Sequence, residues 1–328
     1  MHPAVAVFAR NAWANERLLN WCLWQPAAAS ASGPDVYGDV KSTFNHLLAA
    51  ENRYLQLLTG ELPADAVSEK TPRALEELWE PAGQLARRWN AVLATERDIE
   101  APHVRQRRDG RKVEMPDWLP LVQAVHHGDD HRAQIATLLS RSNVMTPELD
   151  AWYFGFEPPS PRTAPEWAET LLLRGAGHHL WATQKLLEHS ASLGDEQLEL
   201  DAPGTYGSIV ATLNHLVSTD RGYLSRLKRA GLIEPLENAN VATLRDVWDG
   251  QQEAWRAYFN SHPDYESTVE CSDGWYPGWV LVAQAIHHGN DHRTHVGTVL
   301  LAHELQLPEL DVWAYAEAEG VFKTLAAG

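Results

Sequence analysis

The sequence predicts an all-α protein made of two tandem four-helix bundles. Apolar residues recur at three- and four-residue spacing over long segments, which is typical of amphipathic helices. Long blocks of sequence also occur twice: residues 37–58 and 206–227 are identical at nine of 22 positions, and residues 118–139 and 279–300 at 11 of 22. A duplicated domain of about 160 residues explains both matches, because solenoid repeats have much shorter periods.

Two shorter sequence matches lie on either side of these blocks. WANERLL at 13–19 resembles WATQKLL at 181–187, and PELDAW at 147–152 resembles PELDVW at 308–313. The four matched blocks follow the same order in both halves, so the repeat extends from the first helix of each copy into the tail after its last helix.

A proline-rich segment separates the copies. Residues 157–165 contain four prolines in nine positions, and proline cannot continue a helix. We therefore predict a first bundle over 1–157, a linker over 158–165 and a second bundle over 166–328.

Four helices are expected in each copy. Their segments are 5–24, 38–59, 72–97 and 117–141, then 164–192, 207–230, 241–261 and 277–304. Thr71-Pro72 predicts the cap and first position of the third helix, and Met115-Pro116 is expected to lead into the fourth.

The first copy has eight more residues than the second between its second and fourth helices, because the offset between matched blocks falls from 169 to 161. We expect a short β-hairpin there, with its tip at Asp109-Gly110. The hairpin carries five basic residues, which form either a solvated surface or an anion-capturing patch at the mouth of the first site: Arg105, Arg107, Arg108, Arg111 and Lys112.

Composition excludes several classes of function. Lys and Arg total 27 against 44 Asp and Glu, and the formal charge of −17 disfavours a nucleic-acid partner. No apolar stretch approaches the length of about 20 residues that a membrane helix needs, and residues 1–10 lack a signal-peptide pattern. Cys22 and Cys271 are too few for a disulfide framework. We expect a cytoplasmic protein without a membrane partner, either a monomer with an internal pseudo-dimer or a homodimer.

Three histidines of the first copy are candidate metal ligands. His127 and His131 lie four residues apart, so they share one face of the fourth helix, and that face also carries apolar residues. His46 lies on a mostly inward stripe of the second helix. Imidazoles from two facing helices can converge in a bundle core and bind a metal.

The second copy repeats this set with His215, His288 and His292. The alternative is that these are buried, hydrogen-bonded histidines without a ligand role. Three neutral nitrogen ligands leave a coordination position open, as catalytic sites do, and accept zinc, nickel, copper or iron. Gly128 follows His127 where zinc peptidases of the H-E-x-x-H type have glutamate, which disfavours their mechanism.

These residues resemble the DinB/YfiT-like metal-dependent superfamily. The resemblance covers both halves and rests on these stretches: WANERLL at 13–19, Asn45-His46-Leu47, His127-Gly-Asp-Asp-His131-Arg-Ala-Gln134, Asn214-His215-Leu216 and His288-Gly-Asn-Asp-His292-Arg293. It implies four-helix bundles with three-histidine centres for a divalent metal, zinc or nickel foremost and iron as an alternative. Characterised relatives include thiol-dependent S-transferases and a mycothiol-dependent maleylpyruvate isomerase. This chain departs from the usual single-domain member by fusing two copies.

The resemblance implies a thiol-dependent S-transferase that acts on a small electrophile, with a low-molecular-weight thiol as cosubstrate. A metal can hold a thiol as thiolate near neutral pH, and the thiolate is the better nucleophile. The alternatives are a thiol-dependent isomerase, a hydrolase that uses metal-activated water, and a metal- or ligand-binding protein without turnover.

Four charged residues beside the ligands are candidate site residues. Asp130 and Asp291 are expected to orient imidazoles or a thiol amine, or else to be solvated. Arg132 and Arg293 are expected to clamp a substrate carboxylate or, as the favoured alternative, to form structural salt bridges.

Three further histidines lie close to the candidate ligands. His295 occupies the position of Gln134 and is a candidate fourth ligand, base or partner of a ligand; we favour the partner role or neutral drift. His126 and His287 precede each pair and point about 100° away from the ligand face, which favours packing or surface roles.

Overall fold

The computed structural model confirms the all-α class and the tandem bundles. It describes residues 1–25, 27–28, 31–33, 36–106, 110–156, 163–231, 233–236 and 238–325. Arg107, Arg108 and Asp109 of the expected hairpin, and 158–162 of the expected linker, lie outside these residues. Among the described residues, no helix has both the length and the apolar character needed to span a bilayer.

Each half contains four long helices in the expected order. The first half has α1 (Pro3–Trp24), α2 (Val40–Thr59), α3 (Trp79–Leu93) and α4 (Trp118–Arg141). The second half has α6 (Ala168–Ser190), α8 (Ile209–Leu227), α9 (Val241–Asn260) and α10 (Gly278–Ala302). Short helices α5 (Ala151–Phe156), α7 (Asp195–Leu198) and α11 (Val312–Ala318) follow or connect them.

The start of α2 and of its counterpart α8 follows from a side-chain cap. Asp39 accepts a hydrogen bond from the Ser42 backbone N–H, and Ser208 accepts one from the Ala211 N–H. Each satisfies a backbone donor that the first helical turn leaves unpaired. Because these caps are equivalent in the repeat, they begin the two histidine-bearing helices at the same point.

The predicted start of the third helix at Thr71-Pro72 is wrong. The chain first turns helical in a 3-10 segment, Leu75–Leu78, which leads into α3. The Asn45 side chain accepts a hydrogen bond from the Arg73 N–H and donates one to the Arg73 carbonyl, which holds the preceding backbone extended. Similarly, Met115 and Pro116 end a strand, and α4 begins at Trp118.

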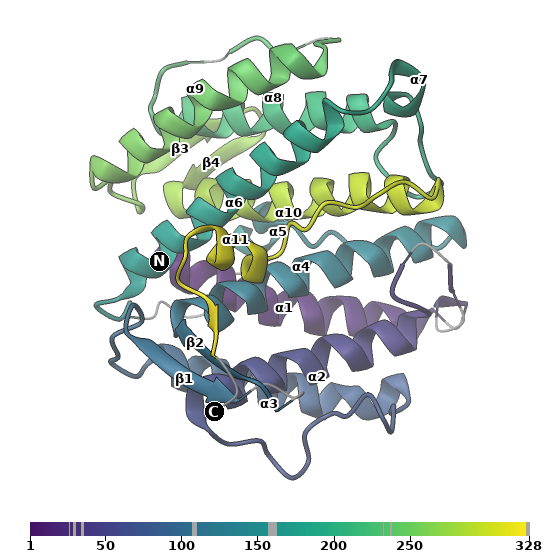
Figure 1. Cartoon of the computed structure of the whole chain (residues 1–328), viewed down its shortest axis with the longest axis vertical. Coiled ribbons are helices and arrows are strands. Elements are labelled where there is room, and N and C mark those ends of the chain that lie inside the picture. Colours follow the sequence, from purple (N-terminus) through teal and green to yellow (C-terminus); the bar gives the residue numbers. More distant parts are fainter. Residues whose placement is uncertain are drawn as a thin grey trace.

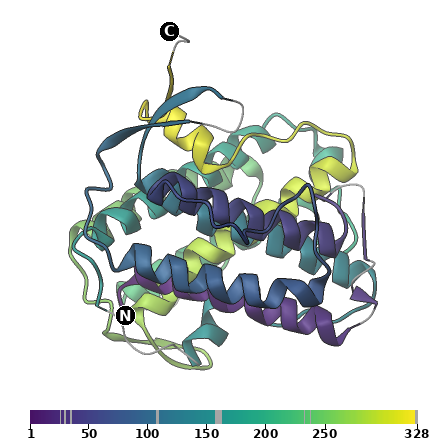
Figure 2. The same cartoon turned by 90° about the horizontal axis from the view of Figure 1, so that it is seen from below.

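Both halves contain a hairpin. The expected one pairs β1 (Pro102–Gln106) with β2 (Lys112–Pro116). A second hairpin, which was not predicted, pairs β3 (Thr268–Cys271) with β4 (Gly274–Pro277) at the same place in the second half. The C-terminal strand β5 (Lys323–Thr324) pairs with β2, so the end of the chain joins the first half's hairpin (Figure 2).

The two halves pack through α4 and α10, which lie next to each other near the centre of the molecule (Figure 1). α1 also contacts α6 and α10. One apolar cluster includes buried residues of both halves, from Ala4 to Phe322. The tails are exchanged: α5 of the first half packs on α10, and α11 of the second packs on α4.

Candidate metal centres

The first triad converges as predicted. His46 on α2 and His131 on α4 each place Nε2 beside Nε2 of His127, at 3.1 Å and 3.2 Å. The i, i+4 spacing puts both α4 imidazoles on one face, and the close packing of α2 against α4 brings His46 onto it.

The second triad has the same form. Nε2 of His215 on α8 lies 3.0 Å from Nε2 of His288 on α10. The rings of His288 and His292 have centroids 4.2 Å apart. In each half, three side-chain nitrogens lie within 4.8 Å of one another.

Burial keeps these imidazoles neutral near pH 7. Desolvation lowers the pKa of His46 to about 4 and that of His292 to about 3. It also holds the pKa values of His127 and His288 well below their ordinary value, with neighbouring imidazoles adding to the effect. The pKa of His131 and that of His215 are lowered for the same first reason. A neutral imidazole offers the lone pair that a metal requires.

Equivalent tyrosines enclose each triad. Tyr37 stacks on His46 with ring centroids 4.0 Å apart, and Tyr206 stacks on His215 at 4.3 Å. Both tyrosines are about half exposed. On the buried side, Tyr54 meets the ring of His127 edge to face. These tyrosines recur in the matched blocks, so the repeat itself signals their positions.

The two sites differ around the α2 and α8 histidines. In the first site, Nδ1 of His46 lies 2.9 Å from the Glu69 carboxylate, which also forms an ion pair with Arg53. Burial alone would raise the pKa of Glu69, but Arg53 and His46 outweigh it and hold the pKa below its ordinary value. In the second site, Nδ1 of His215 lies 3.5 Å from the Thr219 hydroxyl. Glu69 lies in the loop after α2, outside the matched sequence blocks, so no sequence signal marked it.

The candidate site residue Asp130 reaches the first triad through Gln134. The Gln134 amide oxygen lies 3.0 Å from Nδ1 of His131, and its nitrogen donates to Asp130 at 3.3 Å. Asp130 also accepts a 2.7 Å hydrogen bond from Thr294 of the second half. These contacts place Asp130 behind the candidate ligand His131.

In the second site, His295 takes the place of Gln134. Asp291, His292 and His295 each offer a ligand atom within 4.8 Å of the others, and the rings of the two histidines have centroids 5.4 Å apart. Although burial opposes the change, the neighbouring imidazoles of His295 and His292 hold the pKa of Asp291 below its ordinary value. This arrangement favours a role for His295 beside the ligand His292.

Arg132 and Arg293 lie in the buried interior. The Arg132 guanidinium donates to Asn11, Asn15 and Asp129, and that of Arg293 to Thr183 and Asn290. Both side chains are at most 3% exposed. Burial therefore favours a structural role over a clamp on substrate for both residues. Arg132 forms the expected salt bridge, with Asp129, whereas Arg293 donates to uncharged groups.

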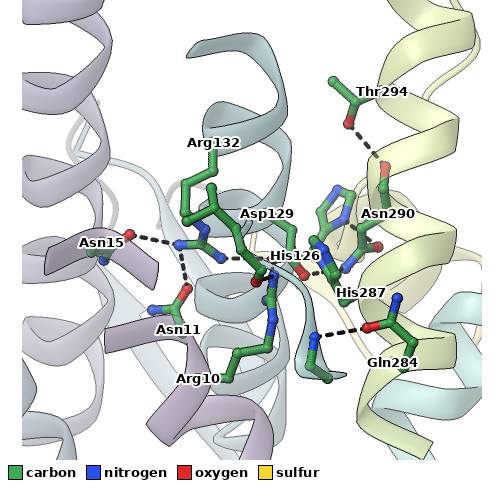
Figure 3. Close-up of polar contacts among 12 residues, drawn as sticks. Arg10, Asn11, Asn15, His126, Asp129, Arg132, Gln284, His287, Asn290 and Thr294 are labelled. Carbon is green, nitrogen blue, oxygen red and sulfur yellow. Dashed lines mark hydrogen bonds and ion pairs between the residues drawn. The ribbon is translucent and has the colours of Figure 1, made fainter. Parts of the chain in front are cut away.

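His126 and His287 point away from the triads, as predicted, and cross between the halves. Nδ1 of His126 lies 3.1 Å from the Asn290 amide oxygen, and Nδ1 of His287 lies 3.1 Å from the Asp129 carboxylate (Figure 3). Although burial opposes ionisation, Arg10 and His287 hold the pKa of Asp129 well below its ordinary value. These residues build the interface between halves.

Gly128 on α4 and Gly289 on α10 each follow the first candidate ligand of their helix, and each faces a neighbouring helix. A Cβ on Gly128 would overlap the Asn11 amide oxygen of α1, and one on Gly289 would overlap the His179 ring of α6. A longer side chain does not fit there, which explains in packing terms why this motif has glycine where H-E-x-x-H has glutamate.

The basic hairpin lies away from the first triad's mouth. Arg105 forms an ion pair with Asp117, which precedes α4. Ten residues of helix separate Asp117 from His127, about 15 Å along the axis. Tyr37 marks the opposite side of the triad, beside His46 and His131. The described part of the hairpin therefore favours a solvated surface over an anion-capturing patch at the first site.

A cavity adjoins the second triad. It has a volume of about 860 Å³ and is lined by His215 and Tyr206 together with residues of α7, α8 and the loop before α9. Its lining includes the acidic Asp195 and Glu199 and the basic Arg226.

Comparisons with known families agree with this architecture. Residues 1–155 match the DinB family, and residues 178–298 match the DinB superfamily, a metal-associated group. No curated protein and no solved structure matches the chain significantly. The two matches cover the two bundles in tandem and include all six triad histidines. The chain therefore belongs to the DinB superfamily and carries its helical domain twice.

Proposed function

We propose that each triad holds a divalent metal ion, zinc or nickel foremost, and that the protein is a thiol-dependent S-transferase acting on a small electrophile. The observation that best supports this proposal is the convergence of neutral imidazole nitrogens in both halves. A divalent ion bound there would lower the pKa of a coordinated thiol or water and so supply an activated nucleophile. The bound thiol would be a low-molecular-weight cosubstrate, and the electrophile would receive its sulfur.

The spacing of the nitrogens fits such an ion. With metal–nitrogen bonds of about 2.0–2.1 Å and angles of about 90–110°, two ligand nitrogens lie about 2.8–3.4 Å apart. The three Nε2 separations given above for His46–His127, His131–His127 and His215–His288 range from 3.0 to 3.2 Å. Packed helices hold these nitrogens together before any ligand binds, which reduces the ordering that binding requires.

The second site is our candidate for substrate turnover. Its cavity of about 860 Å³ is large enough for a thiol and a small electrophile together, and it reaches His215. Tyr206 covers this histidine with a half-exposed ring, so it would contact a molecule that enters. In the first site, Glu69 and Arg53 occupy the outer side of His46.

Metal content tests the first part of this proposal. Elemental analysis of the purified chain should find up to two divalent ions. The His127→Ala/His131→Ala variant should keep one and the His288→Ala/His292→Ala variant should keep the other. His303→Ala, an exposed histidine outside both triads, should change nothing. Absence of bound metal under metal-replete conditions would refute the site.

Turnover tests the second part. The metal-loaded protein is mixed with a panel of low-molecular-weight thiols and electrophiles, and loss of free thiol is followed. We expect consumption that chelation abolishes and that the His288→Ala/His292→Ala variant lacks. Chelator-sensitive activity without thiol would instead indicate a hydrolase, and metal binding without turnover would indicate a binding protein.

A further inference from the structure

The repeated tail blocks, 147–152 and 308–313, cross from one half to the other at matching points. The Leu149 carbonyl accepts a hydrogen bond from Arg10 on α1, and the Leu310 carbonyl accepts one from His178 on α6. Each tail is thus anchored to its own half's first helix up to this leucine. The next residues, Asp150 and Asp311, accept backbone hydrogen bonds at the start of α5 and α11.

Immediately after this point, each tail bonds to the opposite half. The Ala151 N–H donates to the Gln284 amide oxygen at 2.7 Å, and the Val312 N–H donates to the Gln123 amide oxygen at 3.0 Å. Gln123 and Gln284 are equivalent in the repeat, and both are 4% exposed. Figure 3 shows the Gln284 side chain on α10 with its partner from the first half's tail.

The glutamines connect the tails to the triads through tyrosines. Gln123 also interacts with the Tyr54 hydroxyl, and Gln284 interacts with that of Tyr223. The Tyr54 ring centroid lies 5.6 Å from that of His127, and the two rings meet edge to face. Tyr223 meets His288 in the same way at 5.7 Å.

The tail tryptophans reach the same tyrosines. The Trp152 ring lies 5.9 Å from that of Tyr223. The Trp313 ring lies 6.4 Å from that of Tyr54. A continuous chain of contacts therefore runs from each tail to the triad of the opposite half.

We propose that each tail is a positioning element for the opposite half's metal centre, with Trp152 serving the second triad and Trp313 the first. This inference rests on the metal-holding role proposed above. A metal-bound imidazole is usually oriented by a hydrogen bond from its other nitrogen. Among the described residues, Nδ1 of buried His127 has no such partner. Packing against Tyr54 must then set the ring's orientation, and the tail holds Tyr54 in place.

Full-length proteins with one intact triad test this crossed relationship. His127→Ala/His131→Ala leaves the second triad, and His288→Ala/His292→Ala leaves the first. Trp152→Leu and Trp313→Leu are added to each parent, and each protein is loaded with Co²⁺. The visible absorption spectrum and the rate of Co²⁺ release to a chelator are measured.

We expect Trp152→Leu to shift the spectrum and to speed Co²⁺ release from the second triad about threefold to tenfold. This is less than the roughly tenfold to hundredfold effect of losing a direct partner of a ligand. The same change should leave the first triad unaltered. Trp313→Leu should give the reverse pattern, and Trp313→Phe, which keeps a ring against Tyr54, should restore the parent's rate.

Effects on the same half's triad, equal effects on both triads, or no effect on either would overturn the inference. Thermal melts by circular dichroism identify a variant that fails to fold. In that case Gln284→Leu replaces Trp152→Leu, or Gln123→Leu replaces Trp313→Leu, with the same crossed expectation.

If the parents with intact tails bind no Co²⁺, the proposed metal role fails instead. The positioning is then judged on the metal-free protein, where ring resonances of His288 should respond to Trp152→Leu and not to Trp313→Leu; the lack of this crossed response would overturn it.

Discussion

The Asp129 carboxylate of the first half accepts a 3.1 Å hydrogen bond from the Asn290 amide of the second, although the two residues occupy equivalent positions in the repeat. Two buried guanidinium groups, those of Arg10 and Arg132, also contact Asp129 at 2.7 Å. Two carboxylates at this separation could not both ionise in a buried site. The duplicated interface has therefore become asymmetric where its halves meet.

Replacing Asp129 with asparagine should destabilise the protein strongly. Arg10 and Arg132 would lose the charge that balances them in a buried setting, and breaking such a pair costs about 3–5 kcal/mol. Chemical denaturation measures the free energy of unfolding. The neighbouring Asp130→Asn is the matched control, with an expected loss of about 1 kcal/mol because its partners, Thr294 and Gln134, are uncharged. Equal losses in the two variants would contradict the assignment.

Glu69→Gln should weaken metal binding at the first site alone. The carboxylate lies 2.9 Å from Nδ1 of His46 and can make this ligand more basic, and loss of such partners lowers affinity about tenfold to a hundredfold. Competition titrations in the two single-triad proteins measure the effect. Thr219→Ala at the second site should change affinity much less, since its hydroxyl is 3.5 Å from His215. An unchanged first-site affinity in Glu69→Gln would exclude this role.

Gly128→Ala should lower the free energy of unfolding by about 1–3 kcal/mol, the usual cost of overpacking. The added methyl group would meet the Asn11 amide oxygen and the Arg132 guanidinium. Gly250→Ala in α9 is the control: its Cβ meets nothing within 4 Å, and the loss of glycine flexibility should stabilise the helix by about 0.5–1 kcal/mol. A neutral Gly128→Ala would show that α1 can yield at this contact.

The metal-free protein should lose stability as the pH falls from about 6.5 toward 4. In the unfolded chain a histidine has a pKa near 6.5, whereas burial lowers the pKa of His46 to about 4 and that of His292 to about 3. In this window the unfolded chain binds more protons, so the free energy of unfolding decreases with falling pH and is fully retained above pH 6.5.

Denaturation of the metal-free protein at several pH values checks this slope. Each imidazole kept neutral contributes up to about 1.4 kcal/mol per pH unit. The His127→Ala/His131→Ala variant should show a shallower slope between pH 6.5 and 4, and an unchanged slope would contradict neutral burial of these rings.

The candidate ligands could be predicted because they depend on local geometry. His127 and His131 share a helix face through their spacing alone, and the repeat marks His46 as their companion. Glu69 could not be predicted, since it lies in a loop whose path the sequence pattern does not determine. The second hairpin could have been predicted, because β3 and β4 flank Asp273-Gly274, the same turn signal as Asp109-Gly110.

The charged neighbours of the ligands were harder to interpret. No sequence pattern distinguishes Asp129, yet it forms the centre of the buried network between the halves. Arg132 and Arg293 follow a ligand in both copies, and their position alone is compatible with either substrate or structural contacts. Burial decided between these alternatives, and burial depends on which helices pack against α4 and α10.

By itself, the sequence determined the helical class, the duplication and the two histidine triads, because hydrophobic period, self-similarity and residue spacing are local properties of the chain. Only the tertiary structure decided that the tails are exchanged and that Trp152 and Trp313 lie beside tyrosines of the opposite halves. Such contacts depend on how two finished bundles pack, and the same tail sequence could have folded back on its own half. The physical reason is that side-chain periodicity identifies a buried face but not the surface that covers it.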